Sequence, residues 1–363
     1  MPRWIPIIVG LGLGLIVAYL ITDGQWHYAI PLVFAVPAVI VFNRYPFIAI
    51  LMWILVVPFF LNAQNSADRF IFWMFHRGLI PGSLLVVILS DWLKTNNRPL
   101  GKVGRAELAA LIFVSLTILN IFLFAPSVRR TLIQSYDLIF VPFTMYWLIR
   151  LINPTAEDLK RLMWVALFIV LFQSILGMLS WFSPASVPEQ WRSRVEGERT
   201  VGTLKNVAVY TSTLLLFSLL LLQYGVTHRS GWIRYGSLVM FGLAEFCVFL
   251  SFSRASWVGG IAVMVAALIL YPKVVSRLVI IGALLAYIFA GALLADELRF
   301  AVERLSGDEA LNSAESRVIT NNASILMFQE KPTLGWGFKN YDRFDRQFQV
   351  RVGDLAVTND GTS

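Results

Sequence analysis

The sequence is poor in charge, cysteine and histidine, and each shortage excludes a class of protein. Only 14% of its 363 residues are charged and 57% are hydrophobic, whereas a soluble domain carries about 25% charged residues. A water-soluble globule is therefore excluded. The single cysteine, Cys247, excludes a disulfide framework and a thiolate metal site. The three histidines are not in metal-ligand spacing, and no Gly-rich nucleotide loop appears. We therefore expect no metal, no cofactor and no ATP hydrolysis.

The hydrophobic residues occur in long blocks separated by short charged loops. A helix of roughly 20 apolar residues spans a bilayer and satisfies its own backbone polar groups. The blocks predict an all-α, polytopic membrane bundle of about eleven spans. These are Trp4–Thr22, Tyr28–Phe42, Pro46–Asn62, Leu79–Leu93, Leu108–Phe124, Leu132–Ile149, Leu162–Phe182, Val207–Tyr224, Tyr235–Ser251, Ala255–Tyr271 and Leu278–Leu294. Phe70–Phe75 either extends the fourth span or lies at the membrane interface.

The basic loops predict the orientation. Every second connection is basic, beginning with Arg3 and Arg44, and the first connection on the opposite side is not. Positive charge collects on the cytoplasmic side, so we expect a cytoplasmic N-terminus. The net charge of +8 resides in these loops, which argues against nucleic-acid binding.

The chain divides into a membrane bundle, residues 1–294, and a polar extracytoplasmic segment, residues 295–363. Within that segment the spacing predicts short helices over Leu298–Leu305 and Ser316–Glu330, the second ending at Pro332. An odd number of spans and an unfinished outer loop predict that the natural C-terminus is missing.

Two arginines are candidates for binding an anion on the outer face. Arg254 lies at a junction of two spans in Ser251-Phe-Ser-Arg-Ala-Ser-Trp257, and Arg317 is predicted in the first turn of the tail helix. A guanidinium fits phosphate oxygens, and a helix N-terminus favours anions. Alternatively, Arg254 is an interfacial arginine that extends to the membrane surface, and Arg317 is a solvated surface residue.

The loop before Val207 and one intramembrane carboxyl offer further candidates. Arg194, Arg199 and Lys205 surround a glycine and could hold a diphosphate, although an ordinary polar loop is the alternative. Glu245 lies within a span, where a carboxyl is costly and suggests function. The favoured alternative is a carboxyl that is paired or protonated within the bundle. Asp137 falls near a span end and His76 in an outer loop, and neither requires a functional explanation.

Several of these strings resemble motifs of the O-antigen ligase and O-antigen polymerase superfamily. The matching strings, which run in the family's order over roughly residues 199–363, are Arg199 to Asn206, Ser251 to Trp257, Ser316-Arg317, Pro332-Thr-Leu-Gly335-Trp-Gly337 and Asn340-Tyr341.

The resemblance implies a metal-independent glycosyltransferase with a GT-C-like architecture in a bacterial inner membrane. Its donor would be a glycan on undecaprenyl diphosphate and its acceptor a hydroxyl at the membrane surface, such as lipid A-core in lipopolysaccharide biosynthesis. Arg254 and Arg317 would then be catalytic, stabilising the diphosphate leaving group. Arg199, Lys205, Arg194, Gly335 and Gly337 would bind substrate.

Other functions remain open at this stage. A polymerase that joins repeat units shares these motifs, although the tail favours a ligase. A lipid-linked glycan flippase or transporter would use Glu245, but it predicts broken helices and inverted repeats, which the sequence does not show. The family also uses a histidine as general base. No histidine follows His228, so the pattern places this base beyond Ser363.

Overall fold

The structure is a computed structural model that describes residues 4–61, 65–93, 100–102, 104–192, 200–204, 206–289, 299, 308–333, 335–341 and 343–350. It is all-helical over these residues, which confirms the predicted fold class. The principal helices are α1 (Trp4–Thr22), α2 (Trp26–Arg44), α3 (Phe47–Phe60), α4 (Ser66–Phe72), α5 (Ile80–Trp92), α6 (Arg105–Phe124), α7 (Val128–Ser135), α8 (Val141–Ile152), α9 (Ala156–Phe182), α10 (Val207–Thr227), α11 (Gly231–Phe249), α12 (Arg254–Leu270), α13 (Pro272–Phe289) and α15 (Asp308–Glu330).

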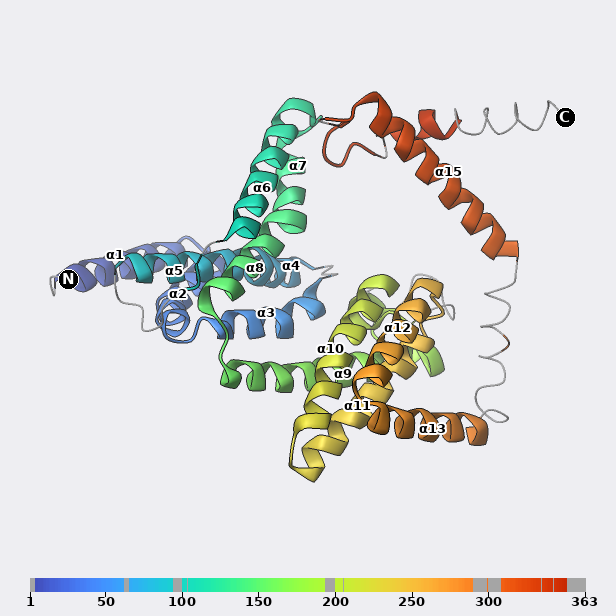
Figure 1. The fold of residues 1–363 in the computed structure, drawn as a ribbon. Coiled ribbons are helices and arrows are strands. Elements are labelled where there is room, and N and C mark those ends of the chain that lie inside the picture. Colours follow the sequence, from blue (N-terminus) through green and yellow to red (C-terminus); the bar gives the residue numbers. More distant parts are fainter. Residues whose placement is uncertain are drawn as a thin grey trace.

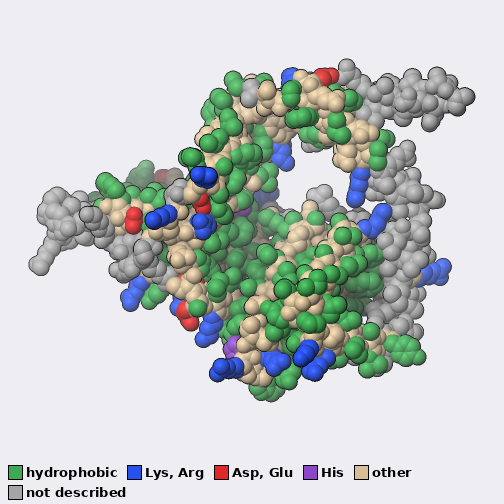
Figure 2. All heavy atoms as spheres, viewed as in Figure 1, with side chains coloured by type: hydrophobic (Ala, Val, Ile, Leu, Met, Phe, Trp, Pro, Cys, Tyr) green, Lys and Arg blue, Asp and Glu red, His purple; other side chains and the backbone are tan. Residues whose placement is uncertain are grey.

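The exterior of the bundle is apolar, as a bilayer requires. Large side chains such as Phe122, Leu216 and Ile269 are more than half exposed, and hydrophobic side chains cover much of the visible surface (Figure 2). In water this surface would be unstable, whereas in lipid it contacts acyl chains. The described residues contain six helices that are long and apolar enough to cross a membrane, or up to seven with one bent pair. The expected number of about eleven spans is therefore not confirmed.

Two of the hydrophobic cores hold the central helices together. The first joins α3, α5 and α8 through residues such as Ile50, Ile80 and Leu148. The second joins α9, α10 and α11 around Tyr210 and Leu214. Ile54 and Phe59 of α3 also pack on the second core, so α3, α5, α8, α9, α10 and α11 form one contiguous bundle (Figure 1).

Two short π-helical turns alter the predicted span boundaries. Trp73–Leu79 joins α4 to α5, and Tyr136–Phe140 joins α7 to α8, giving continuous helices over Ser66–Trp92 and Val128–Ile152. Each turn is followed closely by a proline, Pro81 or Pro142, in the first turn of the next helix. Proline lacks an N–H and clashes with the carbonyl of the preceding turn. A widened π turn relieves that clash without ending the helix.

The helix bounds differ from the predicted spans at two places. The fourth span begins at Ser66 rather than Leu79, because the first π turn continues the helix through the presumed loop. Pro37–Arg44 and Phe47–Phe60 form a pair bent by 117°. This pair is a candidate broken span or re-entrant loop, a feature that the sequence did not reveal.

The tail helix α15 lies outside the bundle, over one of its sides. Figure 1 shows α15 crossing above the ends of α10 and α12 and approaching the free end of the α6–α7 pair. The predicted helix over Leu298–Leu305 lies outside the described residues, apart from Arg299.

Candidate functional site

Arg254 is the first residue of α12, at the tight connection from α11. Phe252, in that connection, has a left-handed backbone (φ +47°) and is only 1% exposed. This conformation is strained for a bulky residue and costs of order 1–3 kcal/mol. It reverses the chain within the connection and directs α12 back across the bundle. The Arg254 side chain is half-buried, and it forms no hydrogen bond or ion pair with other described residues.

Aromatic rings hold this strained connection in place. Phe252 lies 4.6 Å from Trp181 and 5.8 Å from Phe249, measured between ring centroids. The Trp257 indole N–H donates to the carbonyl oxygen of Phe249 at 2.9 Å. That carbonyl belongs to the last turn of α11, where the helix leaves acceptors without helical partners. The frame therefore fixes the N-terminus of α12, and Arg254 with it.

An apolar groove of about 520 Å³ runs along α11, α12 and α13 below this junction. Trp257 and Phe249, which frame the Arg254 junction, also line the groove. Its one carboxyl is Glu245, whose Oε1 accepts a hydrogen bond from the Ser218 hydroxyl at 3.2 Å. This contact confirms that Glu245 has a partner inside the bundle. A coupling role for Glu245 stays a prediction.

The end of the outer loop is fixed to the bundle by the uncharged residues of its motif. The Gln173 side-chain amide donates to the Thr203 hydroxyl at 2.6 Å, and its carbonyl accepts from the Thr203 N–H at 3.1 Å. Asn206 caps α10 by accepting from two backbone N–H groups. The candidate residues Arg194, Arg199 and Lys205 lie outside the described residues.

Arg317 occupies a different place from the one predicted. Because α15 begins at Asp308, Arg317 lies more than two turns inside the helix and does not contact its N-terminus. The anion-binding argument from a helix end therefore fails for Arg317. The sequence missed these earlier turns because Asp308–Glu315 is polar and lacks apolar periodicity. The predicted end of the helix before Pro332 is confirmed.

Arg317 is exposed and has no polar partner among the residues that the structure describes. Figure 2 shows an open space between α15 and the helix bundle, with Lys and Arg side chains along its border. In Figure 1, which has the same orientation, the N-terminal end of α12, where Arg254 is the first residue, lies below α15. Basic side chains of α15 and of the bundle therefore border one open space.

The two tail glycines adopt conformations that favour glycine. Gly335 has φ +65° and Gly337 has φ +98°. A Cβ atom on Gly337 would lie 2.7 Å from Cβ of Phe124 and 2.6 Å from Nδ2 of Asn340. The structure therefore explains Gly337 by backbone geometry and close packing, and a role in substrate binding stays a prediction.

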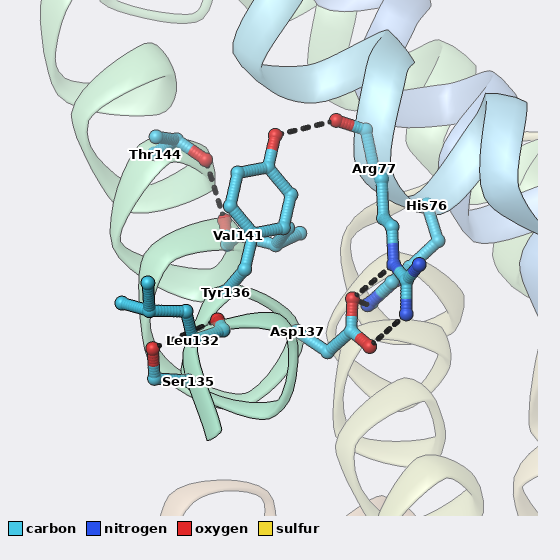
Figure 3. A network of polar contacts seen from close by, with 8 residues as sticks. All are labelled: His76, Arg77, Leu132, Ser135, Tyr136, Asp137, Val141 and Thr144. Carbon is cyan, nitrogen blue, oxygen red and sulfur yellow. Dashed lines mark hydrogen bonds and ion pairs between the residues drawn. The ribbon is translucent and has the colours of Figure 1, made fainter. Parts of the chain in front are cut away.

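A polar network in the first half of the chain was not predicted. Arg77 donates through Nε and Nη2 to both carboxylate oxygens of Asp137, each at 2.6 Å (Figure 3). The Tyr136 hydroxyl donates to the Arg77 carbonyl oxygen at 2.7 Å. His76 is buried against Phe72, with ring centroids 4.8 Å apart.

This network joins the two π turns. Asp137 lies inside the continuous helix Val128–Ile152 rather than near a span end. His76 lies within a continuous helix rather than in a loop. Prolines inside the two apolar runs were the only sequence signal of these turns.

No group of three or more His, Cys, Asp or Glu side chains that could hold a metal ion occurs in the described part of the chain. Metal independence stays a prediction. Arg254 and Arg317 are two arginines without a polar partner among the residues that the structure describes, and a guanidinium of this kind can bind a phosphate group.

The apolar exterior and the long helices define a polytopic helical membrane protein. Residues 236–357, about a third of the chain, match the family model described as O-antigen ligase. This domain match supports the resemblance to the O-antigen ligase superfamily that the motifs suggested. No curated protein and no solved structure matches the chain significantly. The matched segment contains Arg254, Arg317, Gly335 and Gly337, whereas the Arg77–Asp137 network lies outside it.

Proposed function

We propose that this protein transfers a glycan from undecaprenyl diphosphate to a hydroxyl group of a surface acceptor such as lipid A-core. The family supports a ligase or polymerase type of glycosyltransferase. One structural observation carries the proposal for the donor. A half-buried arginine, Arg254, has no counter-ion among the described residues and stands beside the aromatic frame that borders an apolar groove.

The charge at this junction favours an anion. The N-terminus of α12 carries a partial positive charge, and Arg254 adds a full charge at the same point. In contrast, Arg77 pairs with Asp137, and Arg150 pairs with Glu107 at 2.9 Å. Two positive groups without a carboxylate fit a diphosphate, which offers several acceptor oxygens to a guanidinium.

The groove suits the lipid part of the same donor. Its lining is apolar except for Glu245, and its volume lies within the range of about 300–1,000 Å³ that is usual for ligand sites. A prenyl chain along α12 would leave its diphosphate near the outer end of the helix. We therefore place the lipid in the groove, the diphosphate at Arg254 and the glycan in the open space under α15.

The reaction is a substitution at the anomeric carbon. The acceptor oxygen forms a bond to that carbon, and the bond from the carbon to the phosphate oxygen breaks. The bonding electrons leave with the diphosphate, and a general base takes the proton of the acceptor hydroxyl. Arg254 and Arg317, with Arg199 in support, stabilise the negative charge that develops on the leaving group. No metal or cofactor takes part in this scheme.

The test is arginine replacement in the native protein, expressed in cells that lack their own copy. Arg254→Ala and Arg317→Ala should each lower glycan transfer about 10²–10³-fold, the usual cost of removing one group that stabilises a developing anion. Arg254→Lys should recover only part of the activity, because an ammonium lacks the planar fork of donors. Arg130→Ala, another arginine on the predicted outer face, is the matched control. Normal transfer by both alanine variants, at wild-type protein levels, would contradict the proposal.

Transport of a lipid-linked glycan is the second candidate, because two observations favour it. Glu245 lies inside a helix that could cross the membrane, and the bent α2–α3 pair is a candidate broken span. Transport predicts that Glu245→Gln abolishes function while both arginine variants keep it. The products separate ligase from polymerase, since a ligase modifies the acceptor and a polymerase lengthens the donor glycan.

A further inference from the structure

The segment after α15 folds into a small unit with its own core. Ala323 and Met327 of α15 and Phe348 are buried together, with Trp336 packed against them. The Trp336 indole N–H donates to the Met327 carbonyl oxygen at 2.9 Å, and the Lys331 ammonium lies 4.0 Å from the ring centroid. These contacts fix the chain after α15 rigidly on the last turns of that helix.

This unit docks on the end of α6, more than 200 residues earlier in the sequence. The Phe338 N–H donates to Oδ1 of Asn120 at 2.8 Å. Nδ2 of Asn340 donates to the carbonyl oxygens of Phe124 and Trp336, each at 3.0 Å. Phe124 is the last residue of α6, so its carbonyl lacks a partner within the helix. Asn340 is 4% exposed and thus caps a membrane helix from a distant segment.

The backbone approaches α6 so closely that residue 337 must be glycine. A Cβ atom on Gly337 would collide with both Phe124 and Asn340, and its φ of +98° is unfavourable for other residues. Asn120 complements this contact from the membrane side. An asparagine near the end of an apolar helix is costly without a polar partner, and the Phe338 N–H provides one.

We infer that Asn120, Gly337 and Asn340 form a latch that positions α15, and with it Arg317, over the outer end of the bundle. The latch joins the segment at the C-terminal end of α15 to α6, and about 20 Å of helix separates that end from Arg317. A small rotation at the latch is therefore amplified at the arginine. Misplacing a catalytic group by about 1 Å can cost 10²-fold in rate.

This inference rests on the proposed function only for the role of Arg317. The docking of the tail on α6 is supported by the hydrogen bonds to Asn120 and Phe124, independently of the proposed function. Asn120 lies outside the segment that matches the family, and it is a positioning residue because it reaches the reaction only through the tail.

The experiment measures docking and transfer separately in the native protein. Spin labels at Arg130→Cys on α7 and Arg346→Cys in the tail, in a Cys247→Ala background, report the distance between tail and bundle. The unaltered latch should give one narrow distance distribution. Asn120→Ala and Asn340→Ala should each broaden it and lower the turnover rate about 10–100-fold. Donor KM should change less than threefold, because Arg254 and the groove are untouched.

Matched controls keep the latch intact. Thr117→Ala, on the same helix, loses only a hydroxyl contact to Phe113 of α6. Gln349→Ala loses an amide contact to Asp345 in the tail. Both should retain the narrow distribution and the normal turnover rate.

The Arg317→Lys background distinguishes positioning from general stability. If the latch acts through Arg317, Asn340→Ala should lower turnover at most twofold further in that background, because groups that act together are not additive. A narrow distance distribution in Asn340→Ala, or a full additional loss in Arg317→Lys, would overturn the latch. Full transfer by Arg317→Ala would instead overturn the proposed role of Arg317, while the distance measurement would still report whether the tail docks.

Discussion

Gly202 has a left-handed backbone (φ +52°) where the outer loop returns to the bundle. It lies against the Gln173 side-chain carbonyl and the ring of Tyr210, with no room for a Cβ atom. The neighbouring Thr203 completes the paired hydrogen bonds with Gln173. At the scale of residues, these parts of the motif build a rigid base for the loop that carries Arg194, Arg199 and Lys205.

Replacing this glycine should destabilise the protein. Gly202→Ala adds a collision and an unfavourable φ, so we expect a loss of at least 1–3 kcal/mol, roughly the cost of one strained residue. The measurement is thermal unfolding of the purified protein in detergent. Gly242→Ala is the matched control, because nothing lies within 4 Å of its added Cβ. It should be neutral or stabilise α11 by up to about 1 kcal/mol. Equal melting temperatures for the two variants would contradict this account.

At the scale of elements, the paired π turns act as a clamp between two helices. The Arg77–Asp137 pair is bidentate, and its side chains are 27% and 24% exposed. Tyr136 adds a hydrogen bond from the second turn to the backbone of the first. This clamp joins Ser66–Trp92 to Val128–Ile152 at the point where prolines would otherwise weaken each helix (Figure 3).

Replacing one partner of this ion pair should lower the free energy of unfolding more than replacing both partners. Asp137→Asn leaves the Arg77 guanidinium without its counter-ion, and we expect a loss of about 1–3 kcal/mol. This is below the ~3–5 kcal/mol of fully buried pairs, because the side chains are partly exposed. The double variant Arg77→Gln/Asp137→Asn should recover more than half of that loss in thermal unfolding.

The exposed ion pair between Glu157 and Arg161, 3.8 Å apart, provides a matched control. Glu157→Gln, which removes only the exposed carboxylate, should cost no more than about 0.5 kcal/mol. If both single replacements had the same small effect, the clamp would not contribute to stability.

At the scale of the whole molecule, the tail and the end of α6 must lie on the same side of the membrane. Two hydrogen bonds from Phe338 and Asn340 reach Asn120 and Phe124. The sequence independently predicts that the tail is extracytoplasmic, and the contacts would then place the end of α6 on the outer face as well. The structure supports their common side, and the identity of the compartment stays a prediction.

Cysteine labelling in intact cells tests this topology. In a Cys247→Ala background, Arg130→Cys and Lys331→Cys should react with a membrane-impermeant maleimide. Arg229→Cys, in the basic connection between α10 and α11, should react only after the membrane is opened. Labelling of Arg229→Cys in intact cells, with no reaction at Arg130→Cys, would reverse the predicted orientation.

The sequence predicted the parts of the fold that depend on local pattern. Long apolar blocks specify membrane helices because the bilayer leaves backbone groups no other partner. Pro332 specified the end of α15 because proline cannot continue a helix. The start of α15 and the π turns were missed, because polar helical turns and widened turns leave little trace in hydrophobic periodicity.

The sequence by itself determined an all-α membrane protein and the order of its motifs, which hydrophobic length and residue chemistry encode directly. Only the tertiary structure decided which arginines form an ion pair. Arg77 pairs with Asp137 of a neighbouring helix, whereas Arg254 has no partner within the described residues. The docking of the tail on Asn120 was likewise decided by the fold. Its partners are 218 positions apart, and such contacts depend on how helix ends meet in space, which no local pattern records.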